Sequence, residues 1–102
     1  MNTENLTQTT NDAPVKVVLF GVDCGEYDMD RSIAELGALA EANRMEPVAE
    51  VVQKRDVPEG ATYLGEGRLA EAQLLCANLG AEAAIFNDEL TGSQIRNIEA
   101  VL

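Results

Sequence analysis

The feature that most constrains this chain is a threefold alternation between short apolar runs and segments with a helical period. Apolar runs cover residues 15–22, 47–53 and 83–86, and the first is rich in β-branched residues, as is typical of a strand buried on both faces of a parallel sheet. Each run is followed by a segment in which apolar residues recur every three or four positions, which predicts a helix. The order β-α-β-α-β-α predicts an α/β fold with parallel strands joined by right-handed crossovers.

Capping signals set the limits that we predict for the first helix. The apolar period begins at Arg31, and Ser32 and Glu35 have the spacing of a capping box. The helix is expected to end near Asn43, because asparagine tolerates the left-handed conformation at a helix C-terminus.

The other two helices are bounded in the same way. One is predicted from about Gly67 to Gly80, and the other opens with a capping box formed by Thr91 and Gln94. Their apolar faces comprise Leu69, Ala72, Cys76 and Leu79 in the first of them and Ile95, Ile98, Val101 and Leu102 in the second.

The chain divides into a tail and one domain. Residues 1–14 are polar and rich in Thr and Asn, so they are predicted to form a disordered tail. Residues 15–102 form a small, Rossmann-like α/β domain with two or three layers. A helix after the third strand normally leads into a fourth strand, so the apolar end at Val101 and Leu102 predicts a domain that is incomplete at its C-terminus through truncation, without its last strand.

Charge and composition exclude several functions. Seven Lys and Arg against 18 Asp and Glu give a net charge of −11, which repels nucleic acids and anionic membranes as a bulk effect. The absence of Trp and the small number of aromatic residues argue against a base-stacking platform. The absence of His removes the Ser-His-Asp and Cys-His triads and every His-containing metal site.

Targeting signals and cysteines indicate the compartment. The N-terminus lacks the basic and apolar regions of a signal peptide, and the apolar runs are far shorter than the roughly 20 residues of a membrane span. Cys24 and Cys76 are distant in sequence and form no Cys-x-x-Cys motif, which favours buried thiols in a reducing compartment. A cytoplasmic protein without a membrane span is therefore predicted.

In open α/β sheets, ligands bind beyond the carboxyl ends of the strands, where residues 23–30, 54–67 and 87–90 are expected to form loops. Gly65 and Gly67 precede a helix, so their amides can hold a phosphate. No Walker motif is present, and Glu66 places a negative charge between the glycines. A tight turn that sets the helix angle is the alternative interpretation.

A basic cluster is the second candidate. Lys54, Arg55 and Arg68 stand close in sequence in an otherwise acidic chain, with Thr62 and Tyr63 between them. Together with Gln53, these hydroxyl groups can hydrogen-bond a phosphate or a sugar, so the segment is a candidate contact with an RNA backbone. A solvated strand end, balanced by nearby acidic residues, is the alternative.

Acidic residues after the strands are the third candidate. Asp88 and Glu89 follow Asn87, and Asp23 ends the first apolar run, a set that could hold a divalent metal or supply a general base. The alternative is that Asp88 caps the turn before the last helix, and no metal site is predicted.

The last helix carries the fourth candidate. Gln94 has its capping role, and Arg96 and Asn97 lie off the apolar face and are predicted to be exposed. They contact either another domain of a longer protein or solvent.

Three segments in this order resemble the N-terminal domain of the HflX GTPases over residues 15–102. They are Gln53-Lys54-Arg55, then Thr62-Tyr63-Leu64-Gly65-x-Gly67-Arg68, then Asn87-Asp88-Glu89-Leu90 followed by Gln94-x-Arg96-Asn97. Gly21-Val22-Asp23, followed by Ser32-x-x-Glu35-Leu36, fits the same family.

The resemblance implies a translation-associated GTPase that binds the large ribosomal subunit and its rRNA and can split ribosomes under stress. It implies that a helical segment and a GTPase domain, which binds GTP and Mg²⁺, follow this domain in cis. No GTPase motif lies in these 102 residues, so no catalysis and no cofactor are expected here. Nothing but the resemblance implies these properties.

The residues that match the family pattern receive two expected roles. The candidates for contact with rRNA, or for positioning the loop that makes it, are Lys54, Arg55, Thr62, Tyr63, Gly65, Gly67 and Arg68. The candidates for organising the domain or its contacts with the other domains are Asp88, Glu89, Gln94, Arg96 and Asn97.

Three positions depart from the family pattern. Glu66 stands where the family has Lys, Asn87 where Asp is common, and Cys24 where an aliphatic residue is usual. Two functions from other classes stay open beside the ribosomal one. They are a nucleotide-binding module that uses the turn from Gly65 to Gly67, and an enzyme that uses Asp23 and Asp88 with a divalent metal.

Overall fold

The structure is a computed structural model that describes residues 13–102. Of the predicted tail, Ala13 and Pro14 are exposed, and residues 1–12 lie outside the described part of the chain. Within residues 13–102, every helix is too short or too polar to cross a membrane.

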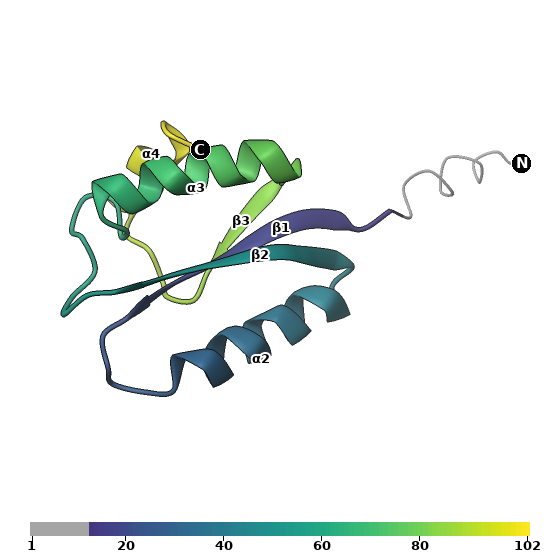
Figure 1. The fold of residues 1–102 in the computed structure, drawn as a ribbon, viewed down its shortest axis with the longest axis horizontal. Coiled ribbons are helices and arrows are strands. Elements are labelled where there is room, and N and C mark those ends of the chain that lie inside the picture. The colour runs from purple at the N-terminus through teal and green to yellow at the C-terminus, as the bar shows by residue number, and fades with distance from the viewer. Residues whose placement is uncertain (1–12) are drawn as a thin grey trace, which may run out of the picture.

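Six elements alternate in the predicted order (Figure 1). They are β1 (Val15–Asp23), α2 (Met29–Ala42), β2 (Met45–Lys54), α3 (Glu66–Leu79), β3 (Ala83–Phe86) and α4 (Gly92–Glu99). The strands form one parallel sheet in the order β2-β1-β3. The α/β class and the parallel sheet are therefore confirmed.

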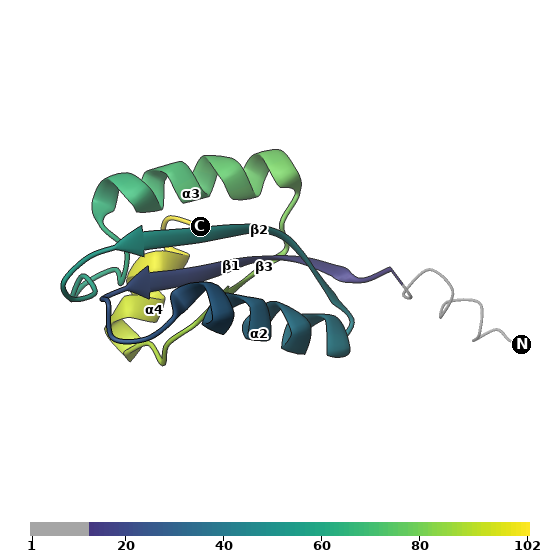
Figure 2. The same ribbon diagram turned by 60° about the horizontal axis from the view of Figure 1, so that its bottom comes forward.

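The sheet lies between helices on both faces, which makes three layers (Figures 1 and 2). Val17 and Leu19 face α2 and pack with Ile33, whereas Phe20 faces the other side and packs with Leu69 of α3. All residues of β1 from Val17 to Phe20 are fully buried, because the central strand is covered on both faces. The continuous apolar run predicted this burial.

The second strand begins at Met45, two residues before the predicted start at Pro47. Pro47 is tolerated because β2 is an edge strand. The register with β1 shifts just after this proline, where Val17 pairs with Pro47 but Val18 pairs with Ala49. The extra residue in β2 is Val48, and the bulge directly follows Pro47, which has no backbone N–H group.

The capping box predicted at Ser32 and Glu35 is wrong. Helix α2 begins at Met29, and the Asp28 side chain accepts a hydrogen bond from Arg31 N. Ser32 lies inside the helix, where its hydroxyl bonds to Asn87 instead.

The end of α2 at Asn43 was predicted correctly, but not its conformation. Asn43 has a φ of −107°, and the left-handed residue is Arg44, with a φ of 63°. The Asn43 side chain donates to Leu39 O at 2.8 Å.

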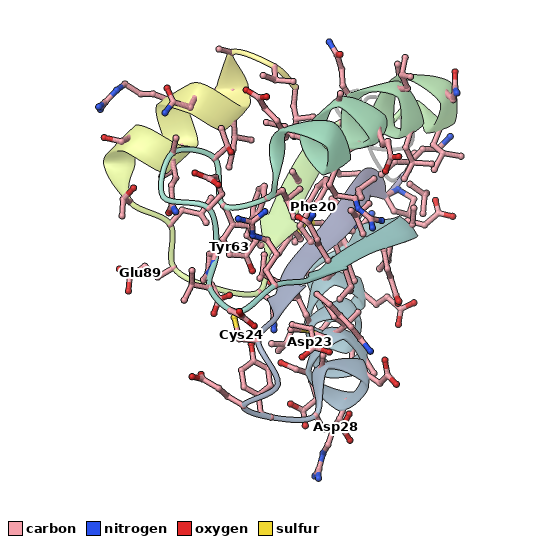
Figure 3. All side chains as sticks on the ribbon, turned by 60° about the vertical axis from the view of Figure 1, so that its left-hand side comes forward. Phe20, Asp23, Cys24, Asp28, Tyr63 and Glu89 are labelled. Carbon is pink, nitrogen blue, oxygen red and sulfur yellow. The ribbon has the colours of Figure 1, made fainter. Side chains whose placement is uncertain are left out.

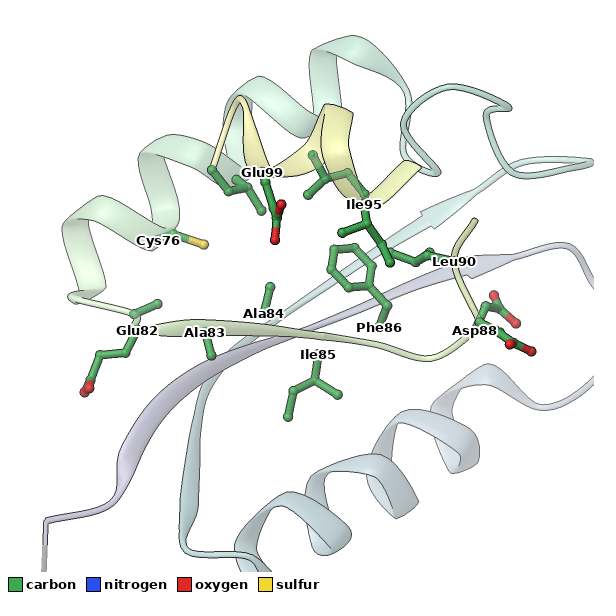
Figure 4. Close-up of a pocket in the computed structure, with 14 residues that line it drawn as sticks. Cys76, Glu82, Ala83, Ala84, Ile85, Phe86, Asp88, Leu90, Ile95 and Glu99 are labelled. Carbon is green, nitrogen blue, oxygen red and sulfur yellow. The ribbon is translucent and has the colours of Figure 1, made fainter. Parts of the chain in front are cut away.

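Helices α3 and α4 follow their predicted caps, with Gly80 left-handed after α3 and both bonds of the Thr91–Gln94 capping box present. Their apolar faces are less covered than predicted, because Leu79 is 36% exposed, Ile95 43% and Leu102 41%. Ile95 and Leu102 border a groove of about 850 Å³ beside the edge strand β3 (Figure 4). Within residues 13–102, no element pairs with the outer edge of β3.

Candidate functional site

The three loops that follow the strands meet at one edge of the sheet, as predicted. Tyr27, Val57 and Asp88, one from each loop, line a shared cleft of about 520 Å³. Figure 3 shows Asp23, Cys24, Tyr63 and Glu89 at this end of the molecule. The topology therefore brings together the segments that carry the candidate residues.

The loop after β2, residues 55–65, closes on itself through its backbone. Glu59 N donates to Tyr63 O at 2.9 Å, and Tyr63 N donates to Glu59 O at 2.8 Å. Between them Thr62 Oγ1 donates to Leu64 O at 2.7 Å. Tyr63 takes a left-handed φ of 65°, a strained conformation for an aromatic residue that its surroundings must hold in place.

Tyr63 is held by its buried side chain, which is only 1% exposed. Its hydroxyl accepts from Val22 N at 3.0 Å and donates to Asp88 Oδ2 at 2.7 Å, and its ring packs edge-on against Phe86. Burial and then the hydrogen bond to Asp88 raise the pKa of Tyr63 well above its usual value. Tyr63 therefore lies in the core at the base of the cleft, where its side chain can position the loop.

Two side chains hold the beginning and the end of the loop. Arg55 Nε donates to Val57 O at 3.1 Å, and Arg55 Nη2 bonds Glu59 Oε1 at 3.2 Å. At the other end, Gly65 N donates to Gln53 Oε1 at 2.8 Å. A Cβ atom at Gly65 would lie 2.8 Å from Arg55 Nη1 and 3.1 Å from Gln53 Nε2, whereas a Cβ at Gly67 would meet nothing within 4 Å. Gly65 thus allows close packing against the end of β2, in keeping with the tight-turn interpretation.

Helix α4 holds the middle of the loop. Gln94 Nε2 donates to Glu59 O at 3.0 Å, and Asn97 Nδ2 donates to Ala61 O at 2.9 Å. Gln94 is only 8% exposed, whereas Asn97 and Arg96 are exposed, as predicted. Arg96 donates to Ser93 Oγ and Glu89 is exposed, so these two side chains do not hold the loop.

Arg55 makes its hydrogen bonds within the loop, whereas Lys54 and Arg68 lie on either side of it. The side chain of Lys54 is exposed and makes no hydrogen bond or ion pair within residues 13–102. Arg68 pairs with Glu71 at 3.7 Å, and both side chains are largely solvated, so this pair is weak and can be exchanged for another partner. Lys54 and Arg68 are therefore the cations that are available for a ligand.

The loop after β1, residues 24–28, contains acidic residues and no basic one. Burial raises the pKa of the Cys24 thiol, and the negative charges of Glu26, Asp88, Asp23 and Asp56 raise it further. Both cysteines are free, as the sequence predicted, but they are half-buried and not fully buried.

The acidic residues at the strand ends take part in local hydrogen bonds. Asp23 Oδ1 accepts from Gly25 N, and Asp88 accepts from Tyr63. The N-cap of α4 is Thr91, as its capping box predicted. Asn87 donates to Ser32 Oγ and Tyr27 Oη. In the described part of the chain, no three His, Cys, Asp or Glu residues are placed to hold a metal ion.

Two residues that hold the loop have roles that were not predicted: Gln53 was considered only as a possible partner of a phosphate or a sugar, and Glu59 was not a candidate. A signal for Gln53 is present, because a helix that begins after Gly65 has no capping side chain of its own and must find an acceptor elsewhere. No local pattern marks Glu59, whose carbonyl contacts an element 35 residues away.

Comparisons with known proteins relate this α/β domain to the N-terminal part of certain GTPases. A family model described as GTP-binding GTPase N-terminal matches residues 30–102. A GTPase HflX of Alkalihalophilus pseudofirmus is 40% identical over 86 residues, which cover 82% of this chain and 20% of that protein. A GTPase HflX of Caldanaerobacter subterraneus subsp. tengcongensis is 37% identical over 73 residues, which cover 72% of this chain and 17% of that protein.

The chain belongs to the HflX GTPase family and represents its N-terminal domain. The resemblance of the sequence segments is thereby confirmed. The chain spans about a fifth of the length of these curated relatives.

Proposed function

We propose that this domain is a recognition and regulatory module of a longer, cytoplasmic HflX-type GTPase, and that it helps this protein to bind the large ribosomal subunit and split ribosomes. The 55–65 loop is the element that contacts rRNA. Lys54 and Arg68 supply the charge, and Arg55, Thr62 and Tyr63 position the loop. GTP and Mg²⁺ bind outside these 102 residues, which contain no Gly-Lys-Ser/Thr sequence.

The observation that carries this proposal is the fixed conformation of the loop between two available cations. Side chains from β2, β3–α4 and α4 hold the loop at both ends and in the middle. A loop that is ordered before binding loses less conformational entropy on contact with a rigid partner such as rRNA. The family membership supports the same proposal.

Acidic residues lie beside the available cations. Asp23 pairs with Lys54 in the sheet register, and Asp56 belongs to the 55–65 loop itself. Carboxylates repel phosphates, so these residues limit the contact that Lys54 and Arg68 can make with the RNA backbone. The net charge of −11 makes strong binding of RNA by this domain alone unfavourable, so the longer protein supplies the rest of the affinity.

A nucleotide held by the turn from Gly65 to Gly67 has less support. The Gly65 amide already donates to Gln53, and Glu66 places a carboxylate at the start of α3, where a phosphate would lie. The two functions differ in a titration with GTP or ATP, in which micromolar affinity of the domain, lost in Gly67→Val, would favour the nucleotide.

The test compares large-subunit binding by the full-length protein with and without the two cations. In Lys54→Ala/Arg68→Ala, we expect weaker binding and a flatter dependence of log Kd on log salt. The slope should fall by about 1 for each phosphate contact that is lost. The measurement is co-sedimentation with large subunits over a series of salt concentrations.

The matched control is Lys16→Ala/Arg44→Ala, which removes the same charge from two exposed residues at the amino ends of β1 and β2, opposite the candidate edge. We expect little change in its salt dependence. The proposal fails if both double variants bind like the wild type, or if both weaken binding equally.

A further inference from the structure

The hydrogen bonds between α4 and the 55–65 loop have a feature that the proposed function does not use. Both are made by side-chain amides of one helix to backbone carbonyls of the loop, Gln94 to Glu59 and Asn97 to Ala61. Residues three apart lie on the same face of a helix. One face of α4 therefore fixes two points of the loop.

Gln94 shows why a specific side chain is needed. Its Oε1 accepts from Thr91 N at 2.9 Å to complete the capping box, and its Nε2 donates to Glu59 O. A capping box accepts either Glu or Gln at this position. Only Gln also provides a donor, so the loop contact and not the cap requires a carboxamide here.

The other contacts of α4 make it a firm support. Ile98, on the same short helix, is 4% exposed and packs in the core cluster that contains Tyr63 and Leu64. The helix and the loop thus share one packed unit. A displacement of α4 would move Glu59 and Ala61, and with them the end of the loop at Tyr63.

We infer that Gln94 and Asn97 are positioning residues for the large-subunit contact: they transmit the position of α4 to the 55–65 loop. This inference rests on the proposed function for the identity of the partner. It adds that the affinity for rRNA depends on two side chains that make no contact with rRNA. It also makes α4 the element through which a change elsewhere in the protein can alter the loop.

The experiment uses the full-length protein with the substitution Asn97→Ala. The matched control is Asn43→Ala, because Asn43 is also exposed and donates through Nδ2 to a carbonyl, that of Leu39 at the end of α2. Hydrogen–deuterium exchange of peptides that cover residues 56–64 is measured in both variants. Binding to large subunits is measured over a series of salt concentrations.

In Asn97→Ala, we expect exchange of the loop to rise about fivefold, the factor that corresponds to one hydrogen bond of about 1 kcal/mol. Binding should weaken by less than this factor in the single variant, because most of the loop stays ordered, and about twofold in Asn97→Ala/Gln94→Glu, which loses both contacts. The salt slope should not change, because no phosphate contact is removed. Asn43→Ala should match the wild type in both measurements. Gln94→Glu, which keeps the capping acceptor and loses the donor, should also raise loop exchange.

Two results would overturn the inference, and neither depends on the proposed function failing. One is loop exchange that is unchanged in both Asn97→Ala and Gln94→Glu. The other is weaker binding in Lys54→Ala/Arg68→Ala together with unchanged binding in Asn97→Ala/Gln94→Glu. A third result would be faster loop exchange in Asn97→Ala while neither Lys54→Ala/Arg68→Ala nor Asn97→Ala/Gln94→Glu affects binding. This result would contradict the ribosomal partner and leave the control of the loop by α4 in place.

Discussion

The loops after β1 and β2 leave the same edge of the sheet but are built differently. In the 55–65 loop, the amides of Glu59, Tyr63 and Gly65 all donate hydrogen bonds within the domain. Of the amides of residues 24–28, only that of Gly25 donates one within residues 13–102, to the side chain of Asp23. The 55–65 loop is ordered by side chains from other elements, whereas the loop after β1 is mainly a short connection to α2.

The comparison indicates that the segments shared with this family contain residues that fix the conformation of the 55–65 loop as well as residues that we propose contact rRNA. Gln53, Tyr63 and Gln94 all lie in those segments, and each makes its hydrogen bonds inside the domain. The side chain of Lys54, in the same segments, makes no hydrogen bond within residues 13–102. The sequence signature thus combines many residues that build the loop with few that are free to bind.

Substitutions of one tyrosine in each loop give the strongest test of whether the two loops are held differently. Tyr63→Phe should lower the free energy of unfolding by about 1–3 kcal/mol, because Val22 N and Asp88 lose a buried partner. Tyr27→Phe removes a hydroxyl from a side chain that is 49% exposed, so its effect should stay within about 0.5 kcal/mol. Urea denaturation of the two variants checks this difference, and equal losses would show that the two loops are held alike.

Substitutions of Gly65 and Gly67 test, with a smaller expected effect, whether the end of the 55–65 loop is held by close packing. Gly65→Ala should lower the free energy of unfolding by about 1 kcal/mol, because its Cβ would displace Arg55 and Gln53 from their hydrogen bonds with the loop. Gly67→Ala adds a methyl group where there is space inside a helix, so it should stabilise by about 0.5–1 kcal/mol. Thermal unfolding of both variants gives the signs. Two destabilised variants would mean that the turn as a whole, and not its packing at Gly65, requires glycine.

Much of the fold could be predicted because it follows from local patterns. The continuous apolar run at Val17–Phe20 predicted a strand covered on both faces, and Thr91 with Gln94 predicted the start of α4. The start of α2 was missed because Asp28 and Ser32 are both good capping residues. The choice between them depends on Asn87, which bonds to Ser32 from a distant loop.

The candidate site was predictable in its location and less so in its contacts. Parallel topology alone brings the three loops to one edge, and the structure places them there. The pairing of Asn97 with Ala61 and of Tyr63 with Asp88 joins residues that are 36 and 25 positions apart. No periodicity or capping rule relates such positions, because their contact is set by the tertiary arrangement of the loops and α4.

The central claim is that the 55–65 loop is ordered before any partner binds, and hydrogen–deuterium exchange of the free full-length protein tests it most directly. After correction for intrinsic rates, we expect the amides of Glu59, Tyr63 and Gly65 to exchange about thirtyfold more slowly than those of residues 26–28. This factor corresponds to two net hydrogen bonds of about 1 kcal/mol each. Equal and fast exchange in the two loops would contradict the claim.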